Sequence, residues 1–592
     1  MAAQSPLWAV RQGREACASR PVLQLSQTAN PNSLMGMRDG MRMGWRWIAT
    51  ACLALGIVPA ARAETLTYTL TPKFDEGRLD VELTWETEGR QQSFLAVSSH
   101  FGRVEKVPEL LHDVRFEGAS ATSQNGPIWR IDHRKGAAFT VRYSVVSGRR
   151  EFDADDTHYP IVTKDFYHGI GNAFLLVPQI AGREKEEYET ILRWQLPSGQ
   201  VAACSWGVGR TIGARMRAAD LRNSVYLAGK LITESRKQDG LDITVVLVDR
   251  FAFKAEAFAR VTSSIIKGQC DFMGEKNFPP FVITAVPVGP PVREGESRLS
   301  GSGLYNSFAL FAAPKSDLND AAEHLFAHEL FHYWNGRTLE AADPERLVYW
   351  FTEGFTDYYA LRILYESGRW EAPRYVKWIN RHVREYFANP ARNAGNDRIL
   401  QDYWNQRDTV GEVAYQRGLL LGLRWHKLAR DNGVKGGLDR LFLRLVERGR
   451  GGEMKLTNGI IRQAGVETLG AWFGPEFDRY VERAETIDVP TDVLTPRIAG
   501  RLTDVYEFEP GFDRERSLKS KKVQGVKADG PAATAGLKNG DELVGWSIAG
   551  DADKPITLQV KRGKDVKKIE YLPRGAKRAM IQFEPSAARS SP

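Results

Sequence analysis

The stretch His324-Leu-Phe-Ala-His328-Glu329-Leu-Phe-His332-Tyr-Trp-Asn335 decides how the centre of this chain folds. We expect a helix from about Ser316 to Trp334, capped by Ser316 or Asp317, with Gly336 just past its end. In a helix of about 3.6 residues per turn, positions 328 and 332 lie on one face, one turn apart. Two imidazoles at that spacing can bind one metal ion, and Glu329 can reach a water molecule beside the metal without displacing it.

A second stretch supplies the acid that such a site needs, because catalytic zinc takes three protein ligands and keeps one position open. Trp350-Phe-Thr-Glu353-Gly-Phe-Thr-Asp357-Tyr-Tyr359 places Glu353 twenty-one residues after His332, a span that lets a helix–turn–helix return it to the histidines. Asp357 can accept a hydrogen bond from a ligand imidazole and fix its tautomer. We predict one zinc ion held by His328, His332 and Glu353, with Glu329 as catalytic base and Asp357 and Asn335 around the ligands.

His324 lies on the same helix face, one turn before His328. A closed site with four protein ligands would leave no open position for catalysis. We therefore expect His324 to be a neighbour or an outer partner of the ligands.

Both stretches resemble the gluzincins, the metallopeptidases with a glutamate as third zinc ligand, and most closely the glycyl aminopeptidase family. That family pairs H-E-x-x-H-x-W-N with W-x-x-E-G-x-T-x-Y-Y, and both motifs are intact here. The resemblance implies a zinc peptidase with an N-terminal β domain, a thermolysin-like catalytic domain and a C-terminal PDZ domain. It also implies that Tyr415, in Val413-Ala-Tyr415-Gln-Arg417-Gly418, stabilises the oxyanion that develops during hydrolysis, with Arg417 where the family usually has Lys.

One stretch departs from the family. Its members usually carry a Gly-Gly-x-Glu-His-like sequence on a substrate-binding edge strand, and the Glu is thought to pair with the amino terminus of the substrate. The corresponding stretch here is Gly301-Ser-Gly303-Leu304-Tyr305-Asn306-Ser307, which has no acid. We predict substrate contacts from Gly303, Leu304 and Tyr305, and Glu294 or Glu296 is the candidate substitute for the acid. A buried ammonium without a partner is costly, so an endopeptidase or an altered specificity is the alternative to an aminopeptidase.

Hydropathy patterns divide the chain into regions. From Glu64 to about Val248 apolar residues alternate with polar ones, which predicts an N-terminal antiparallel β domain over residues 64–252. Longer segments of helical period follow, which predicts an α+β catalytic domain rich in helices over 253–490. After a linker from Pro490 to Pro496, residues 497–585 resemble a PDZ-like β domain, chiefly through the stretch Gly536-Leu-Lys-Asn-Gly-Asp541.

Residues 42–63 have the features of an export signal, whereas residues 1–36 do not resemble one. Arg42 and Arg46 precede an apolar run from Trp47 to Ala60, and Ala61-Arg-Ala63 is a typical cleavage site. The run is shorter than the ~20 residues of a membrane span, so we expect cleavage after Ala63 and a periplasmic or secreted protein without a stable span, with an uncleaved anchor as the alternative.

The charge of the chain gives little sign of a nucleic-acid partner. The formal net charge is +8, but residues 1–63 hold seven Arg against two acids, so only about +3 is left for the other 529 residues. Cys204 and Cys270 remain after cleavage, and one disulfide or two buried thiols are both open. A peptide-binding protein with an inert metal site and a zinc hydrolase of a non-peptide substrate are the other function classes considered.

Overall fold

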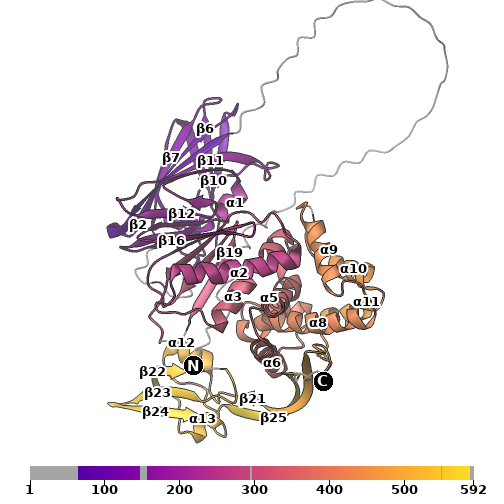
Figure 1. Cartoon of the computed structure of the whole chain (residues 1–592). Helices are drawn as coiled ribbons and strands as arrows, with labels where there is room; N and C mark the ends of the chain where they lie inside the picture. Colours follow the sequence, from indigo (N-terminus) through magenta and orange to yellow (C-terminus); the bar gives the residue numbers. More distant parts are fainter. Residues whose placement is uncertain are drawn as a thin grey trace, which may run out of the picture.

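The computed structural model describes residues 64–146, 152, 157–293, 297–452, 454–548 and 550–586. The predicted leader, residues 1–63, and both Glu294 and Glu296 lie outside the described residues. Figure 1 shows a β-rich N-terminal region, a helix-rich middle and a small C-terminal region drawn in yellow. The chain is therefore multidomain, with several β-sheets and a helical centre, as the hydropathy patterns predicted.

A six-stranded sheet in the order β14-β11-β1-β2-β7-β4 forms the base of the N-terminal region. Its strands are β1 (Thr65–Lys73), β2 (Arg78–Glu86), β4 (Leu111–Glu117), β7 (Phe139–Val146), β11 (Glu187–Trp194) and β14 (Thr211–Arg217). In β1 and β2 alternate residues are buried, which is the two-residue period seen in the sequence. The pairs are antiparallel except β1 with β11, which is parallel.

Two smaller sheets complete this region. One has the order β10 (Val177–Pro178), β3 (Gln92–Ala96), β6 (Ile128–His133) and β5 (Ala119–Asn125). The other has the order β13 (Gly207–Val208), β12 (Val201–Cys204), β15 (Val225–Gly229), β9 (Phe166–Ile170) and β8 (Ile161–Val162), and α1 (Ala218–Arg222) lies between two of its strands in sequence. Their shared apolar core extends to Val282 and Phe311 of the next sheet, so the N-terminal region packs directly on the centre.

The central sheet corrects the first predicted domain boundary. Its order is β16 (Ile232–Gln238), β17 (Leu241–Leu247), β18 (Phe281–Pro287), β20 (Ser307–Ala312) and β19 (Leu299–Leu304). The predicted boundary after residue 252 assigned β16 and β17 to the N-terminal domain, but β17 pairs in parallel with β18. The chain therefore changes sheet near residue 230, and the two-residue period alone could not show which sheet each strand joins. Strand β19 pairs antiparallel with β20 and forms one edge of this sheet.

Helices cover the central sheet and share one large apolar core with it. They are α2 (Ala255–Met273), α3 (Asp320–Phe331), α4 (Tyr349–Thr352), α5 (Gly354–Glu366), α6 (Ala372–Ala388), α7 (Asn396–Asp402), α8 (Glu412–Asp431), α9 (Asp439–Gly449), α10 (Asn458–Leu469) and α11 (Phe473–Phe477). In Figure 1, α2 and α3 lie near the sheet, and α5, α6 and α8 lie beyond them.

Helix α3 is shorter than predicted. Its cap is Asn319, whose side-chain oxygen accepts hydrogen bonds from the backbone N–H groups of Ala321 and Ala322. Ser316 does not cap the helix, because its hydroxyl accepts a hydrogen bond from the backbone N–H of Arg298. The predicted caps, Ser316 and Asp317, lie two or three positions too early, because several residues that can cap a helix precede α3.

The end of α3 also differs from the prediction. A single π-helical turn, η5 (Tyr333–Thr338), follows Phe331, and within it Asn335 and Gly336 leave helical geometry. Gly336 has a φ of 154°, in the region that favours glycine. Trp334 and Asn335 therefore lie in a kinked turn rather than on the helix.

The C-terminal region contains a long two-stranded ribbon and a small sheet. The ribbon pairs β21 (Ile498–Phe508) with β25 (Arg574–Pro585), and the sheet has the order β22 (Glu542–Ser547), β23 (Ile556–Arg562) and β24 (Asp565–Tyr571). Helices α12 (Arg514–Ser520) and α13 (Pro531–Thr534) pack on a separate small core. Between β22 and β23, residues 548 and 550–555 include no helix. The ribbon lies beside α6, where the Asn380 side chain makes two hydrogen bonds to the backbone of Phe583 (Figure 1).

The two mature-chain cysteines are both buried and free, in different cores: Cys204 in the N-terminal core and Cys270 in the central core. This resolves the open alternative in favour of two buried thiols. Burial raises the pKa of both thiols. Among the described residues, no helix combines the length and apolar character that a membrane span requires.

Candidate metal centre

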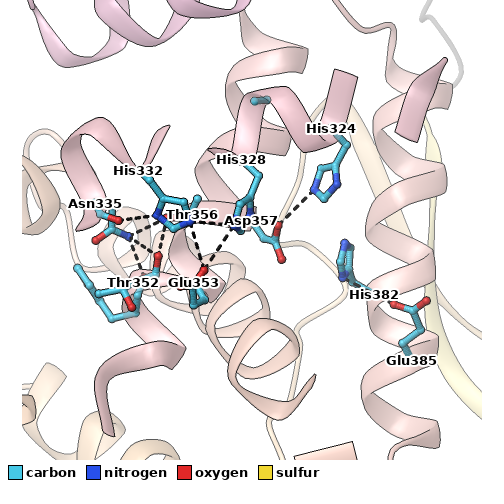
Figure 2. Close-up of polar contacts among 12 residues, drawn as sticks. His324, His328, His332, Asn335, Thr352, Glu353, Thr356, Asp357, His382 and Glu385 are labelled. Carbon is cyan, nitrogen blue, oxygen red and sulfur yellow. Dashed lines mark hydrogen bonds and ion pairs between the residues drawn. The ribbon is translucent and has the colours of Figure 1, made fainter. Parts of the chain in front are cut away.

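His328 lies on α3 and His332 caps the end of that helix, and the two rings lie side by side (Figure 2). Their Nε2 atoms lie 3.1 Å apart, and the two rings are nearly perpendicular with centroids separated by 4.8 Å. His328 is buried and His332 is partly buried. The spacing of four residues therefore brings the two imidazoles together, as the sequence predicted.

Glu353 lies where α4 meets α5, and its carboxylate points toward both histidines (Figure 2). Its Oε2 atom is 3.4 Å from Nε2 of His328 and 3.3 Å from Nε2 of His332. With the 3.1 Å between the two Nε2 atoms, the three donor atoms form a nearly equilateral triangle. Tetrahedral zinc with ligands at about 2.0–2.1 Å requires neighbouring donors about 3.3 Å apart. The donor types and their spacing therefore fit one zinc ion.

Two glycines bring Glu353 to this position. The backbone around Gly354 touches that of α8 at Gly418. A Cβ added to Gly354 would lie only 2.5 Å from the Gly418 Cα. A Cβ on Gly418 would overlap the backbone oxygen of Trp350. The two chain segments therefore cross without side chains between them, and this contact holds the start of α5 against the helix that carries Tyr415.

Hydrogen bonds orient both ligand rings. The Nδ1 group of His328 donates to Oδ1 of Asp357 at 2.6 Å, and that of His332 donates to the backbone oxygen of Asn335 at 2.8 Å (Figure 2). A hydrogen bond donated by Nδ1 leaves the lone pair on Nε2, the atom that faces the centre of the triangle. The Asn335 side chain donates to the backbone oxygen of Phe351 and to the hydroxyl of Thr356, which fixes the kinked turn.

Asp357 is buried and contacts two histidines. Burial tends to raise its pKa, but the neighbouring imidazoles of His328 and His324 hold that pKa well below its ordinary value. Nε2 of His324 lies 3.3 Å from the same Oδ1 atom, and the ring packs on Trp378 at 4.4 Å. His324 therefore faces Asp357 and not the triangle, which places it among the outer partners of the ligands.

Glu329 and Tyr415 lie beside the triangle on different helices. A carboxylate oxygen of Glu329 and one ring nitrogen each from His328 and His332 all lie within 4.8 Å of one another. The Tyr415 ring, on α8, is stacked near His328 with a centroid distance of 6.3 Å. Both side chains are buried. An acid and a phenol therefore border the same small space as the three donor atoms.

The edge strand β19 runs past this group. A Cβ on Gly303 would lie 3.7 Å from the His332 Cβ, and 3.4 Å from the backbone oxygen of Glu329, so Gly303 is adjacent to the centre. Leu304, on the opposite face of the strand, is buried in the N-terminal apolar core. The structure thus brings Gly303 to the site and leaves Leu304 away from it, because sequence alone does not show which face of a strand points inward. Tyr305 is partly buried at the end of the strand.

Arg337 is a residue of this neighbourhood that the sequence did not single out. Its guanidinium lies over the Tyr305 ring at 4.4 Å and donates a hydrogen bond to the side chain of Asn306. Burial raises the pKa of Tyr305, while Arg337 lowers it. No motif marks Arg337, because its place depends on the kinked turn after α3.

Comparison with known families identifies the central segment. Residues 322–406 match the family model described as M61 glycyl aminopeptidase, and they include the three donor residues. The fold is similar to that of an aminopeptidase N family protein from Idiomarina loihiensis, with a TM-score of 0.65, 15% sequence identity, and coverage of 88% of this chain and 98% of that chain. The family match indicates a peptidase, and the solved structure shows that the fold is that of an aminopeptidase N family protein.

A second group of solved structures is less similar to this chain. An M1 zinc metallopeptidase from Deinococcus radiodurans has a TM-score of 0.44 and 16% identity, with 74% of this chain and 97% of that chain covered. That similarity is too low to assign roles to residues of this chain. The search of curated proteins found no relative.

Proposed function

We propose that this chain is a zinc-dependent peptidase whose single zinc ion is held by His328, His332 and Glu353. The observation that carries the proposal is the triangle of donor atoms with edges of 3.1–3.4 Å. Two neutral imidazoles and one carboxylate are a common ligand set of catalytic zinc, and three protein ligands leave one position open. The hydrogen bonds that orient both rings add further support.

The chemistry assigned to the chain follows from the side chains around this triangle. When bound, zinc polarises the scissile carbonyl and makes water nucleophilic at neutral pH. Glu329 accepts a proton from the attacking water and delivers it to the leaving amine. The Tyr415 phenol donates a hydrogen bond to the oxyanion that develops on the carbonyl. Asp357 and the backbone of Asn335 keep the ligand imidazoles in place throughout.

The bond that is cleaved has two candidate positions. The M61 match favours removal of an amino-terminal residue. Arg337 favours cleavage within a chain, because its guanidinium lies 4.4 Å from the Tyr305 ring and repels a free ammonium group. The anion that also acts on Tyr305, Asp220, is paired with Arg217. We keep aminopeptidase activity as the first candidate and endopeptidase activity as the second, and the substrate in both is a peptide or protein.

Two variants and a peptide library test this proposal. Glu329→Gln keeps the size of the side chain, so we expect it to retain zinc and to lose at least about 10²-fold in activity, the low end for a general base. Tyr415→Phe should also retain zinc and reduce kcat. Digestion of peptides with free and blocked amino termini, with products identified by mass spectrometry, assigns the cleavage position. Turnover like that of the wild type in zinc-loaded Glu329→Gln would refute the role of Glu329.

The remaining regions carry proposals of their own. We propose a thermolysin-like arrangement for the catalytic region. We also propose a PDZ-like fold for residues 497–585, supported by the succession of the short helix α13, a turn at Gly540 and the strand β22. A peptide ligand for that unit has less support, since the described residues between β22 and β23 form no helix that could close a groove. No nucleic acid is proposed as a partner.

Export to the periplasm or the outside of the cell, with cleavage after Ala63, is also a proposal. Glu64 belongs to the folded region, because this residue is buried, its carboxylate accepts a hydrogen bond from the Trp85 indole, and it pairs with Arg90 at 3.0 Å. A mature chain that starts at Glu64 would keep these contacts. Amino-terminal sequencing of the purified protein tests the cleavage position, and a sequence that starts before Glu64 would contradict it.

A further inference from the structure

Arg337 is a cation without a matching anion beside the edge strand β19. Its guanidinium contacts the rings of Tyr305, at 4.4 Å, and Tyr333, at 5.5 Å, and donates a hydrogen bond to the amide oxygen of Asn306. Among the residues that the structure describes, no carboxylate lies within 4.0 Å of its nitrogens. A guanidinium has five N–H donors, so these neutral contacts leave donors unused.

A second arginine nearby, Arg217, differs from Arg337 because it has a carboxylate partner. Arg217 makes two hydrogen bonds to Asp220, at 2.7 and 2.9 Å, and both charges act on Tyr305. Asp220 raises the pKa of Tyr305, whereas Arg337 and Arg217 lower it. Arg217 has a carboxylate partner of its own, whereas Arg337, among the described residues, has only neutral contacts at the end of β19.

The position of β19 explains why this charge matters for a substrate. Among the described strands β19 pairs with β20 alone, so its other edge offers backbone groups to an extended peptide. Gly303 lies against Glu329 and His332, and Tyr305 follows two residues later, in the hairpin turn just after β19. A peptide that extends along β19 from Glu329 towards this turn therefore approaches Arg337, whose guanidinium lies over the Tyr305 ring.

The geometry points to Arg337 as a specificity-determining residue that binds an acidic side chain, Asp or Glu, of a peptide lying along β19. This inference rests on the proposed peptidase function and deepens it by naming the substrate class. A carboxylate matches the planar guanidinium and fills its unused donors. A free α-ammonium or a Lys side chain at the same place is repelled, so the preferred substrates are acidic peptides cleaved away from a free amino terminus.

Matched peptides and three variants test the inference. The peptides differ only by Glu, Gln or Lys at each position flanking one cleavable bond, with free and acetylated amino termini. For the zinc-loaded full chain we expect kcat/KM for the best Glu peptide to exceed that of its Gln partner by about tenfold, the size of a hydrogen bond to a charged group. Arg337→Gln should abolish this ratio and Arg337→Glu should reverse it in favour of Lys.

Asn306→Asp is the most direct test, because it leaves Arg337 in place and gives its guanidinium a carboxylate partner within the chain. Asn306 has a φ of 41°, a conformation that Asp also tolerates. We expect Asn306→Asp to lose the preference for Glu while cleaving the Gln peptide as the wild type does. A purely structural role of Arg337 predicts a uniform loss over all peptides and no dependence of the Glu-to-Gln ratio on salt concentration.

The outcomes separate the two proposals. Hydrolysis without a charge preference, or a preference that survives both Arg337→Gln and Asn306→Asp, would overturn the inference and leave the peptidase function intact. If the zinc-loaded chain cleaves none of the peptides, the proposed function fails, and equilibrium binding of the same peptides decides the inference. Tighter binding of the Glu peptide that Asn306→Asp removes would support it, and equal binding of all three peptides would refute it.

Discussion

Replacement of Asp357 by Asn probes how the protein holds its zinc ligands. The substitution keeps the shape of the side chain and removes its negative charge. In the wild type, Oδ1 accepts a hydrogen bond of 2.6 Å from His328 and lies 3.3 Å from Nε2 of His324. An amide oxygen can still accept one hydrogen bond, but it attracts the two imidazole N–H groups less than a carboxylate does, and the NH2 group brings unwanted donors.

The expected effect is a loss of zinc affinity. Changes in the groups that orient ligand imidazoles typically weaken metal binding by about 10–100-fold, which corresponds to about 1.4–2.8 kcal/mol. We expect the upper part of this range, because Asp357 is buried and solvent cannot replace its hydrogen bond. The measurement is a zinc dissociation constant, obtained by competition with a chelator of known affinity.

Asp439→Asn is the matched control. Asp439 also forms a polar contact, partly buried, with two hydrogen bonds to Arg362 at 2.6 and 3.0 Å, but it contacts none of the three proposed zinc ligands. This control should lower stability without changing the zinc dissociation constant. A dissociation constant for Asp357→Asn within twofold of the wild type, in a protein that remains folded by circular dichroism, would refute the proposed role of Asp357.

Four other outcomes are expected. Removal of zinc with a chelator should abolish peptide hydrolysis, and added zinc should restore it, as a coupled activity assay can show. Gly418→Ala should lower the melting temperature measured by calorimetry, because the new methyl group overlaps the backbone oxygen of Trp350 and overpacking costs about 1–3 kcal/mol; a stability equal to the wild type would contradict the close crossing. His168 is buried and burial lowers its pKa to about 3, so stability is full above the unfolded pKa of about 6.5 and falls as protons bind the unfolded chain at lower pH. His168→Phe should therefore lose less of its melting temperature between pH 7 and pH 5 than the wild type. Asn380→Ala removes both hydrogen bonds to Phe583, so limited proteolysis should release the C-terminal region faster, while Asn432→Ala, elsewhere on the surface, should not change the rate.

The grouping of the proposed zinc ligands was predictable because these residues depend on local geometry. His328 and His332 converge through the period of a single helix, and Glu353 follows after a span that one turn can close. Asn335 was predicted to lie around the ligands, but not how it contacts them: its backbone oxygen, and not its side chain, accepts a hydrogen bond from His332. That detail depends on a π-helical turn, which no residue pattern in this stretch marks.

The features of the fold and site that could not be predicted from the sequence depend on contacts between distant segments of the chain. Leu304 and Gly303 are neighbours, and only the packing of β19 decides which one faces α3. Strands β16 and β17 alternate in the same way as the strands before them, and only their pairing with β18 assigns them to the central sheet. Arg337 became a candidate only through its contacts with Tyr305 and Asn306, which lie about thirty residues earlier in the chain.

The backbone contact between Gly354 and Gly418 has a mechanical consequence. Protein interiors are close-packed and transmit strain rather than absorbing it. Where α5 begins against α8, backbone meets backbone with no side chain between them, so no rotamer change can accommodate added volume there. A shift of the start of α5, which carries Glu353, is therefore transmitted directly to the helix that carries Tyr415.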